Sequence, residues 1–365
     1  MKHLPLLLFI CLSSIGFDVQ ATHIMGVNLH YDCISSDSIR LTVNRYYDCT
    51  GGATTALPGP PSAPHAIFRG TGIRCVSPSQ IGSWRSIHYI DITPVCPGTR
   101  TGCNSTPFGQ NAAINGTVES IYESDWDFSS SNCIQYDVSW SECCRNTSIT
   151  SGASSDGVYL DGLTIDLSLT ACNSSPRFLN PPVIYICAQA PARFEHQAYD
   201  PDGDSLAYSL VSCKQGASNN VRYDPGFSPL QPLGPSWIVD VDTLTGDVSL
   251  TPIPGNMVIG VLCVEVREYR NGSLLSTTTR DMQFYVINCP ANDNPTINQM
   301  TVLSGANLRG SYALDGAVGT PLSFSVQVID PNPGDSLTTY FDTTASQVSG
   351  LSYTTTGINP QVITA

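Results

Sequence analysis

The sequence predicts an all-β protein, in which tandem antiparallel β-sandwich modules of the Ig or cadherin type follow a signal peptide. Apolar and polar residues alternate in many short segments, and no stretch keeps a helical period. An acidic turn also occurs twice, each time after an alternating segment. The two copies are Asp200–Leu206 (DPDGDSL) and Asp330–Leu337 (DPNPGDSL). A repeat of strand, acidic turn and strand is typical of modular β-sandwich proteins.

The N-terminus, Met1–Ala21, has the features of a secretory signal peptide. Lys2 gives a basic start, Leu6–Leu12 an apolar centre, and Val19-Gln20-Ala21 a small-residue cleavage site. The apolar run is too short to span a bilayer, and no longer run follows it, so we expect no membrane insertion. The sequence therefore predicts a secreted protein, placed on the outer surface of a bacterial cell, whose mature chain begins at Thr22.

The first expected domain covers residues 22–179. Val27, Leu29 and Tyr31 alternate with polar residues, and so do Ile39, Leu41 and Val43, which predicts a hairpin through the turn at residues 35–38. Two more alternating strands are expected over Ile134–Trp140 and Leu163–Leu169. The proline-marked segment Asn180-Pro181-Pro182 is the expected end of this domain.

The second expected domain covers residues 180–290 and has the length of one Ig-type sandwich. The dipeptide Asn271-Gly272 predicts a tight hairpin between its last two strands. The expected strands are Phe194–Tyr199, Leu206–Ser212, Trp237–Val241, Asp247–Leu250, Val258–Arg270 and Ser276–Asn288.

The third segment, residues 291–365, begins like the second domain and then stops after a few strands. An incomplete sandwich leaves an open edge and an unfilled core, so we expect a truncated second Ig-like module. The remaining modules of the same longer chain would then be its partners. A short, complete domain of another type is the alternative.

The cysteines indicate an oxidising compartment. The chain has 14 cysteines, and Cys11 lies in the signal peptide. Such a density is typical of secreted proteins. Neither a CxxC nor a HxxxH spacing occurs, which disfavours a zinc site. We expect Cys213 to pair with Cys263, Cys33 with Cys49 and Cys96 with Cys103, and the adjacent Cys143 and Cys144 to belong to two different disulfides.

The net charge of −14 and a pI of about 4.6 limit the partners. No basic stripe is available to neutralise phosphates, so nucleic acid and anionic lipid surfaces are disfavoured. A surface polysaccharide or a protein ligand remains.

The acidic turns predict calcium sites. Closely spaced carboxylates repel one another unless water or a cation screens them, and calcium prefers such hard oxygen ligands. An ordinary solvated turn is the alternative, because Pro-Asp-Gly-Asp is also common turn chemistry. The candidate ligands are Asp200, Asp202 and Asp204 with Glu195 in the first turn, Asp330 and Asp335 in the second, and Asp293 at the junction of the last two domains.

No catalytic motif stands out in the sequence. Neither HExxH nor GxSxG occurs, so we expect no enzyme, although a carboxylate pair of the glycosidase type stays open. We expect Trp140 and Trp237 in the core, because they lie on alternating strands. Trp126, between Asp125 and Asp127, is the best candidate for an exposed sugar-stacking ring.

Several segments resemble the N-terminal part of a family of secreted surface proteins of Bacteroidetes, described as gliding-motility-associated or PKD- and cadherin-like. The most specific segment is Ser139–Asn146 (SWSECCRN). The others are Ala21–Gly26, Tyr31–Cys33, Tyr47–Cys49, Asn180–Pro182, Asp200–Leu206 and Glu265–Cys289. The resemblance implies an adhesin-like role, and a C-terminal sorting domain that this sequence lacks.

Together these observations predict a secreted or cell-surface, adhesin-like structural protein whose modules calcium makes rigid. The alternatives are the non-catalytic, carbohydrate-binding N-terminal region of an extracellular polysaccharide-processing enzyme, and a hydrolase in its own right.

Overall fold

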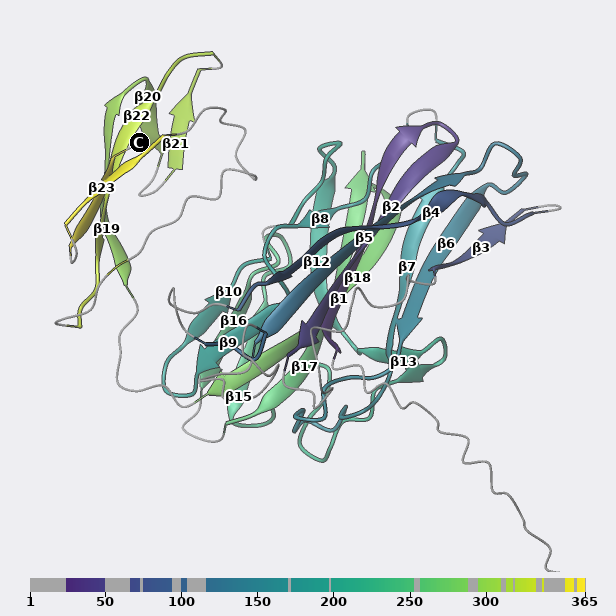
Figure 1. Ribbon diagram of the computed structural model, residues 1–365, viewed down its shortest axis with the longest axis horizontal. Coiled ribbons are helices and arrows are strands. Elements are labelled where there is room, and N and C mark those ends of the chain that lie inside the picture. The colour runs from purple at the N-terminus through teal and green to yellow at the C-terminus, as the bar shows by residue number, and fades with distance from the viewer. Residues whose placement is uncertain are drawn as a thin grey trace, which may run out of the picture. The chain divides into compact units, whose positions relative to one another are not determined.

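The prediction of an all-β protein is confirmed. A computed structural model describes residues 24–49, 66–72, 75–93, 100–103, 116–169, 172–196, 198–252, 257–287, 295–309, 313–317, 319–332, 337, 352–357 and 360–364. Within these ranges every regular element is a strand, and all the sheets contain antiparallel pairs (Figure 1). None of the described residues belongs to a helix long and apolar enough to cross a membrane.

The chain divides into two units, Met1–Ile287 and Asn288–Ala365. The boundary expected at residues 179 and 180 falls inside the first unit. Strand β1 (Ile24–Ser35) pairs with β18 (Ser273–Ile287), with Val27 opposite Asp281. The segments on either side of Asn180 therefore share one sheet, because the backbone groups on one edge of β18 are paired with an N-terminal strand.

The large sheet has the strand order β12-β17-β18-β1-β2-β5-β4, and β9 adds to β18 in parallel. Both predicted hairpins are present: residues 35–38 join β1 to β2, and Asn271-Gly272 joins β17 to β18 with positive φ angles of 53° and 80°. The remaining strands are β2 (Ser38–Asp48), β4 (Ser79–Asp91), β5 (Thr117–Asp127), β9 (Val183–Cys187), β12 (Ser205–Val211) and β17 (Ile259–Arg270).

Three smaller sheets lie in the described part of the first unit. The five-stranded sheet has the order β14 (Asn219–Asn220), β13 (Lys214–Gly216), β7 (Val158–Asp166), β6 (Gln135–Glu142) and β3 (Ala66–Thr71). The three-stranded sheet contains β10 (Ala192–Phe194), β16 (Val248–Pro252) and β15 (Trp237–Val241), and the last pair is β11 (Ala198–Tyr199) with β8 (Arg177–Phe178).

Two hydrophobic cores lie on opposite faces of the large sheet. One contains Val27 of β1 together with Trp140 and other residues of the five-stranded sheet. The other contains Met282 of β18 together with Trp237 and other residues of the three-stranded sheet. Asp281 faces the same side as its partner Val27, and Met282, the next residue, faces the other, as strand alternation requires.

The tryptophans follow the prediction in two cases. Trp140 and Trp237 are buried, with 1% and 3% of their surface exposed. Trp126, expected as a surface ring, instead packs against the first core with its ring centroid 4.4 Å from that of Phe68. The aspartates beside it point to the other face of β5, so flanking charge was a poor guide to exposure.

The disulfide between Cys213 and Cys263 is confirmed. The expected Cys33–Cys49 and Cys96–Cys103 pairings are wrong: Cys33 lies near the turn of its hairpin and Cys49 follows its open end, and both bond elsewhere. Cys143 and Cys144 bond to each other, contrary to expectation. Cys96 lies outside the described residues. The other bonds are Cys33–Cys172, Cys49–Cys103 and Cys75–Cys133, and Cys187 is also disulfide-bonded.

The second unit is small. Its four-stranded sheet has the order β19 (Thr296–Ser304), β22 (Ser323–Ile329), β24 (Gln361–Thr364) and β23 (Thr354–Thr356), and β20 (Ala306–Arg309) pairs with β21 (Ala313–Gly316). Phe324 and Val326 of the expected alternating strand are buried with Ile363.

Candidate functional site

The first acidic turn connects β11 to β12 and folds around its own first aspartate. Oδ1 of Asp200 accepts hydrogen bonds from the backbone N–H groups of Asp202 (2.9 Å) and Asp204 (3.1 Å). Gly203 has a φ of +84°, a conformation that favours glycine. This bend brings one carboxylate oxygen from each aspartate within 4.8 Å of the others.

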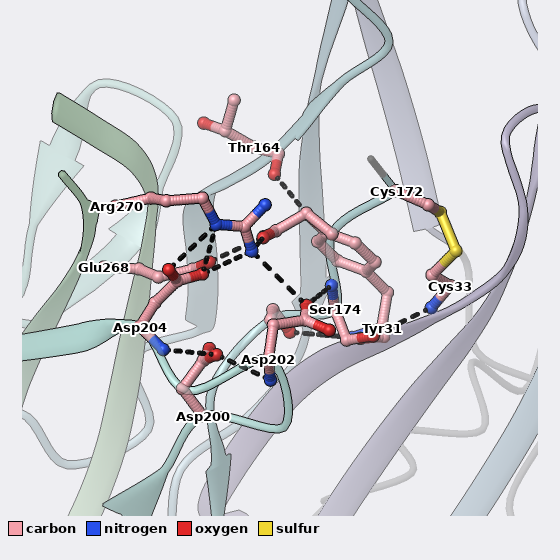
Figure 2. A network of polar contacts seen from close by, with 12 residues as sticks. Tyr31, Cys33, Thr164, Cys172, Ser174, Asp200, Asp202, Asp204, Glu268 and Arg270 are labelled. Carbon is pink, nitrogen blue, oxygen red and sulfur yellow. Dashed lines mark hydrogen bonds and ion pairs between the residues drawn. A yellow bond between two sulfur atoms is a disulfide. The ribbon is translucent and has the colours of Figure 1, made fainter. Parts of the chain in front are cut away.

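Arg270 faces the turn from the end of β17 (Figure 2). Its Nε lies 2.9 Å from Oδ1 of Asp204 and its Nη2 lies 2.5 Å from Oδ2 of the same carboxylate. The same Nη2 is 3.7 Å from Asp202. The antiparallel register of β12 and β17 pairs Ser205 with Tyr269, so the residues just before and just after them meet. A guanidinium therefore offsets part of the charge of the acidic turn.

The loop that contains Asn173 and Ser174 joins this network. The side-chain oxygen of Asn173 accepts a hydrogen bond from Arg270 (2.6 Å), and its Nδ2 donates to Oε1 of Glu268 (2.6 Å). The backbone N–H of Ser174 donates to Asp202 (2.6 Å). The disulfide of Cys172 with Cys33 ties this segment to β1 (Figure 2). The acidic turn is thus joined to the N-terminal hairpin.

Glu268 is fully buried beside Asp204. Burial raises its pKa from about 4.5 to about 8, a hydrogen bond from Asn173 opposes this rise, and the charges of Asp200 and Asp204 add to it. Between about pH 4.5 and pH 8, Glu268 therefore keeps its proton in the folded protein and loses it in the unfolded chain. The contribution of this proton to stability is fully present below about pH 4.5 and is lost as the pH rises through about 8.

Asp200 keeps acceptor capacity. Its Oδ2 is buried and has no hydrogen-bond partner among the described residues. Burial also raises the pKa of Asp200, the two backbone hydrogen bonds oppose the rise, and the charges of Asp204 and Asp202 add to it. Among the oxygens of this turn, Asp200 Oδ2 is the one that most needs a further partner.

The other predicted ligands do not join this cluster in the described structure. Glu195 is half-exposed, and its nearest cation is Arg193 at 3.8 Å. Asp330, in the second unit, is buried and accepts a hydrogen bond from the backbone of Asn332 (2.8 Å). Asp293 and Asp335 lie outside the described residues.

Sequence reasoning missed Arg270, Glu268 and Asn173. A signal for Arg270 was present, because it ends one strand just before the Asn271-Gly272 turn while Asp204 begins a neighbouring one. Nothing local to Asn173 indicated that its loop returns to the acidic turn.

The segment Ser139–Asn146 supplies internal contacts. Arg145 makes two hydrogen bonds of 2.6 Å to Asp281, and both side chains are buried, with 1% and 0% exposed. Asn146 donates to Asp48 (2.6 Å) and to the hydroxyl of Tyr285 (2.9 Å). These contacts join residues on both sides of Asn180, so the segment stabilises the first unit.

No family model matches the chain, and no curated protein sequence is significantly similar to it.

Proposed function

We propose that this chain is a secreted or cell-surface structural protein with an adhesin-like role, built from Ig- or cadherin-like β-sandwich modules. The observation that carries the proposal is the way disulfides join distant parts of one all-β unit. Cys33 and Cys172 are 139 residues apart, and Cys75 and Cys133 are 58 apart. Disulfides over such spans persist in oxidising, extracellular surroundings and restrict the unfolded chain.

The arrangement of β17 and β18 supports a mechanical role. The two strands pair from Ile259 with Tyr285 to Arg270 with Ser273, a long antiparallel ladder in the middle of the large sheet. A buried ion pair also joins the sheet to a neighbouring segment, since Arg145, outside the sheet, contacts Asp281 on β18. The loss of one partner of such a buried pair is strongly destabilising.

Calcium at the first acidic turn remains part of this proposal. Asp200 Oδ2 and the exposed carboxylate of Asp202 are the oxygens available to an ion. Arg270 competes with calcium for the same charge, so we expect a weak site that fills only at millimolar calcium.

The ligand that fits an acidic, lysine-poor surface is an uncharged surface polysaccharide or a protein. The resemblance to secreted surface proteins of Bacteroidetes leads to the same class of partner.

Bead adhesion tests the proposal. Beads coated with residues 22–365 are flowed over layers of purified bacterial envelope polysaccharide or envelope protein, and their retention is compared with that of beads coated with reduced and alkylated chain. We expect the oxidised chain alone to hold beads on one of the layers. Equal retention of the two kinds of bead on both layers would contradict the proposal.

A further inference from the structure

A polar groove lies on the outer face of the five-stranded sheet. It has a volume of about 500 Å³ and is lined by β3, β6 and β7 on one side and by β12, β17 and β18 on the other. Strand β7 lies beside β18 (Figure 1), and the backbone N–H of Thr164 donates to the hydroxyl of Ser276 (3.2 Å). The volume of the groove is in the range of ordinary ligand sites, which is about 300–1,000 Å³.

A β-bulge shapes the floor of the groove. Val138 of β6 pairs with Leu163 of β7, but Trp140 pairs with Leu160, so β7 carries one extra residue opposite Ser139. Gly162, at this bulge, has a φ of +88°, and a Cβ there would lie 3.6 Å from the carbonyl oxygen of Thr277. Bulges of this kind re-aim side chains and are frequent beside functional sites.

Ser139 is the strongest evidence for a ligand site in the groove. Only 4% of this residue is exposed, it lines the groove, and its hydroxyl has no hydrogen-bond partner within the described part of the chain. Buried hydroxyl groups are nearly always hydrogen-bonded. A hydroxyl group of a ligand in the groove would supply the partner.

The charges in and around the groove balance. Lys214 pairs with Asp161 at 2.7 Å, and Glu265 pairs with Arg267. Arg69 of β3 stands opposite Asp137 of β6 in the strand register and forms no ion pair with another described residue. A ligand therefore needs no net charge, and it meets both donors and acceptors.

We propose that this groove binds a neutral oligosaccharide. Carboxylates and guanidinium groups present forked acceptors and donors that match adjacent sugar hydroxyls. The hydroxyl groups of Ser139, Thr277 and Thr279 add single contacts along the groove. The inference rests on the proposed function, since it names the ligand class of an attachment protein.

Calorimetric titration of the oxidised chain, residues 22–365, tests the site. The probes are short neutral oligosaccharides of glucose, mannose, galactose or xylose. The variants are Ser139→Ala and Arg69→Gln, and the matched controls are Ser141→Ala, two residues along β6 and outside the groove, and Arg100→Gln, an exposed arginine elsewhere. Melting temperatures establish that all four variants fold.

We expect at least one probe to bind. Arg69→Gln should weaken binding about tenfold, because it removes a hydrogen bond to a charged group. Ser139→Ala should weaken it about threefold to tenfold, and the controls should bind like the wild type. Binding that both groove variants leave unchanged, or no binding of any probe, would overturn the groove assignment. None of these results would remove bead adhesion, which decides the proposed function separately.

Discussion

Replacing Arg270 by glutamine tests the acidic turn most sharply. The guanidinium makes contacts of 2.9 Å and 2.5 Å to Asp204, whose side chain is only 6% exposed, while Arg270 itself is 27% exposed. Exposed ion pairs contribute about 0–1 kcal/mol, whereas removing one partner of a fully buried pair costs about 3–5 kcal/mol. This pair lies between the two cases, so Arg270→Gln should lower the free energy of unfolding by about 2–3 kcal/mol.

Urea unfolding of residues 22–365 measures this loss. Arg267→Gln is the matched control on the same strand, because its side chain is 45% exposed and its partner Glu265 is 22% exposed. It should cost less than about 1 kcal/mol. A loss at Arg270 no larger than that at Arg267 would refute our assignment of the guanidinium as the main screen of the turn.

Calcium extends the same experiment. Without the guanidinium, the three aspartates keep their mutual repulsion, so millimolar calcium should raise the melting temperature of Arg270→Gln more than that of the wild type. If calcium shifts neither protein, the turn is solvated and the calcium proposal is wrong.

Two further predictions concern the same unit. Glu268→Gln keeps a neutral side chain at this position, so its stability relative to the wild type should rise between about pH 4.5 and pH 8, and a flat difference across this range would contradict the raised pKa. Replacing Cys33 and Cys172 by alanine opens a loop of 139 residues and should cost about 2–5 kcal/mol in unfolding experiments. Replacing Cys143 and Cys144, whose disulfide joins adjacent residues, should cost much less, and equal losses would count against chain entropy as the cause.

The sequence predicted the features that depend on local residue patterns, namely strand positions and hairpin turns. Alternation located β1 and β2, and the expected strands Leu206–Ser212, Val258–Arg270 and Ser276–Asn288 agree with β12, β17 and most of β18. Asn271-Gly272 predicted its hairpin because its two residues adopt positive φ angles with little strain.

Long-range pairing was not predictable in the same way. The pairing of Val27 with Asp281 joins strands far apart in the chain, and no local signal selects one distant strand as the partner of another. The expected division at residue 180 followed from prolines alone. The partners of Cys33 and Cys49 depended on where distant loops return, so proximity in sequence favoured the wrong pair.

The sequence predicted the acidic part of the candidate site but not its arginine. The acidic residues were visible in the sequence, and we expected calcium as the cation that faces them. In the structure the guanidinium of Arg270 faces them. Its position follows from the register of β12 and β17, which only the folded sheet defines.

Deletion of the gene in the organism that produces the protein tests the central claim most directly. Attachment of the deletion strain to a surface is compared with that of the wild type, and intact cells are labelled with an antibody against residues 22–287. We expect labelling of intact wild-type cells, and weaker attachment of the deletion strain that the wild-type gene restores. Labelling only after the cells are lysed, or unchanged attachment, would contradict an exported attachment protein.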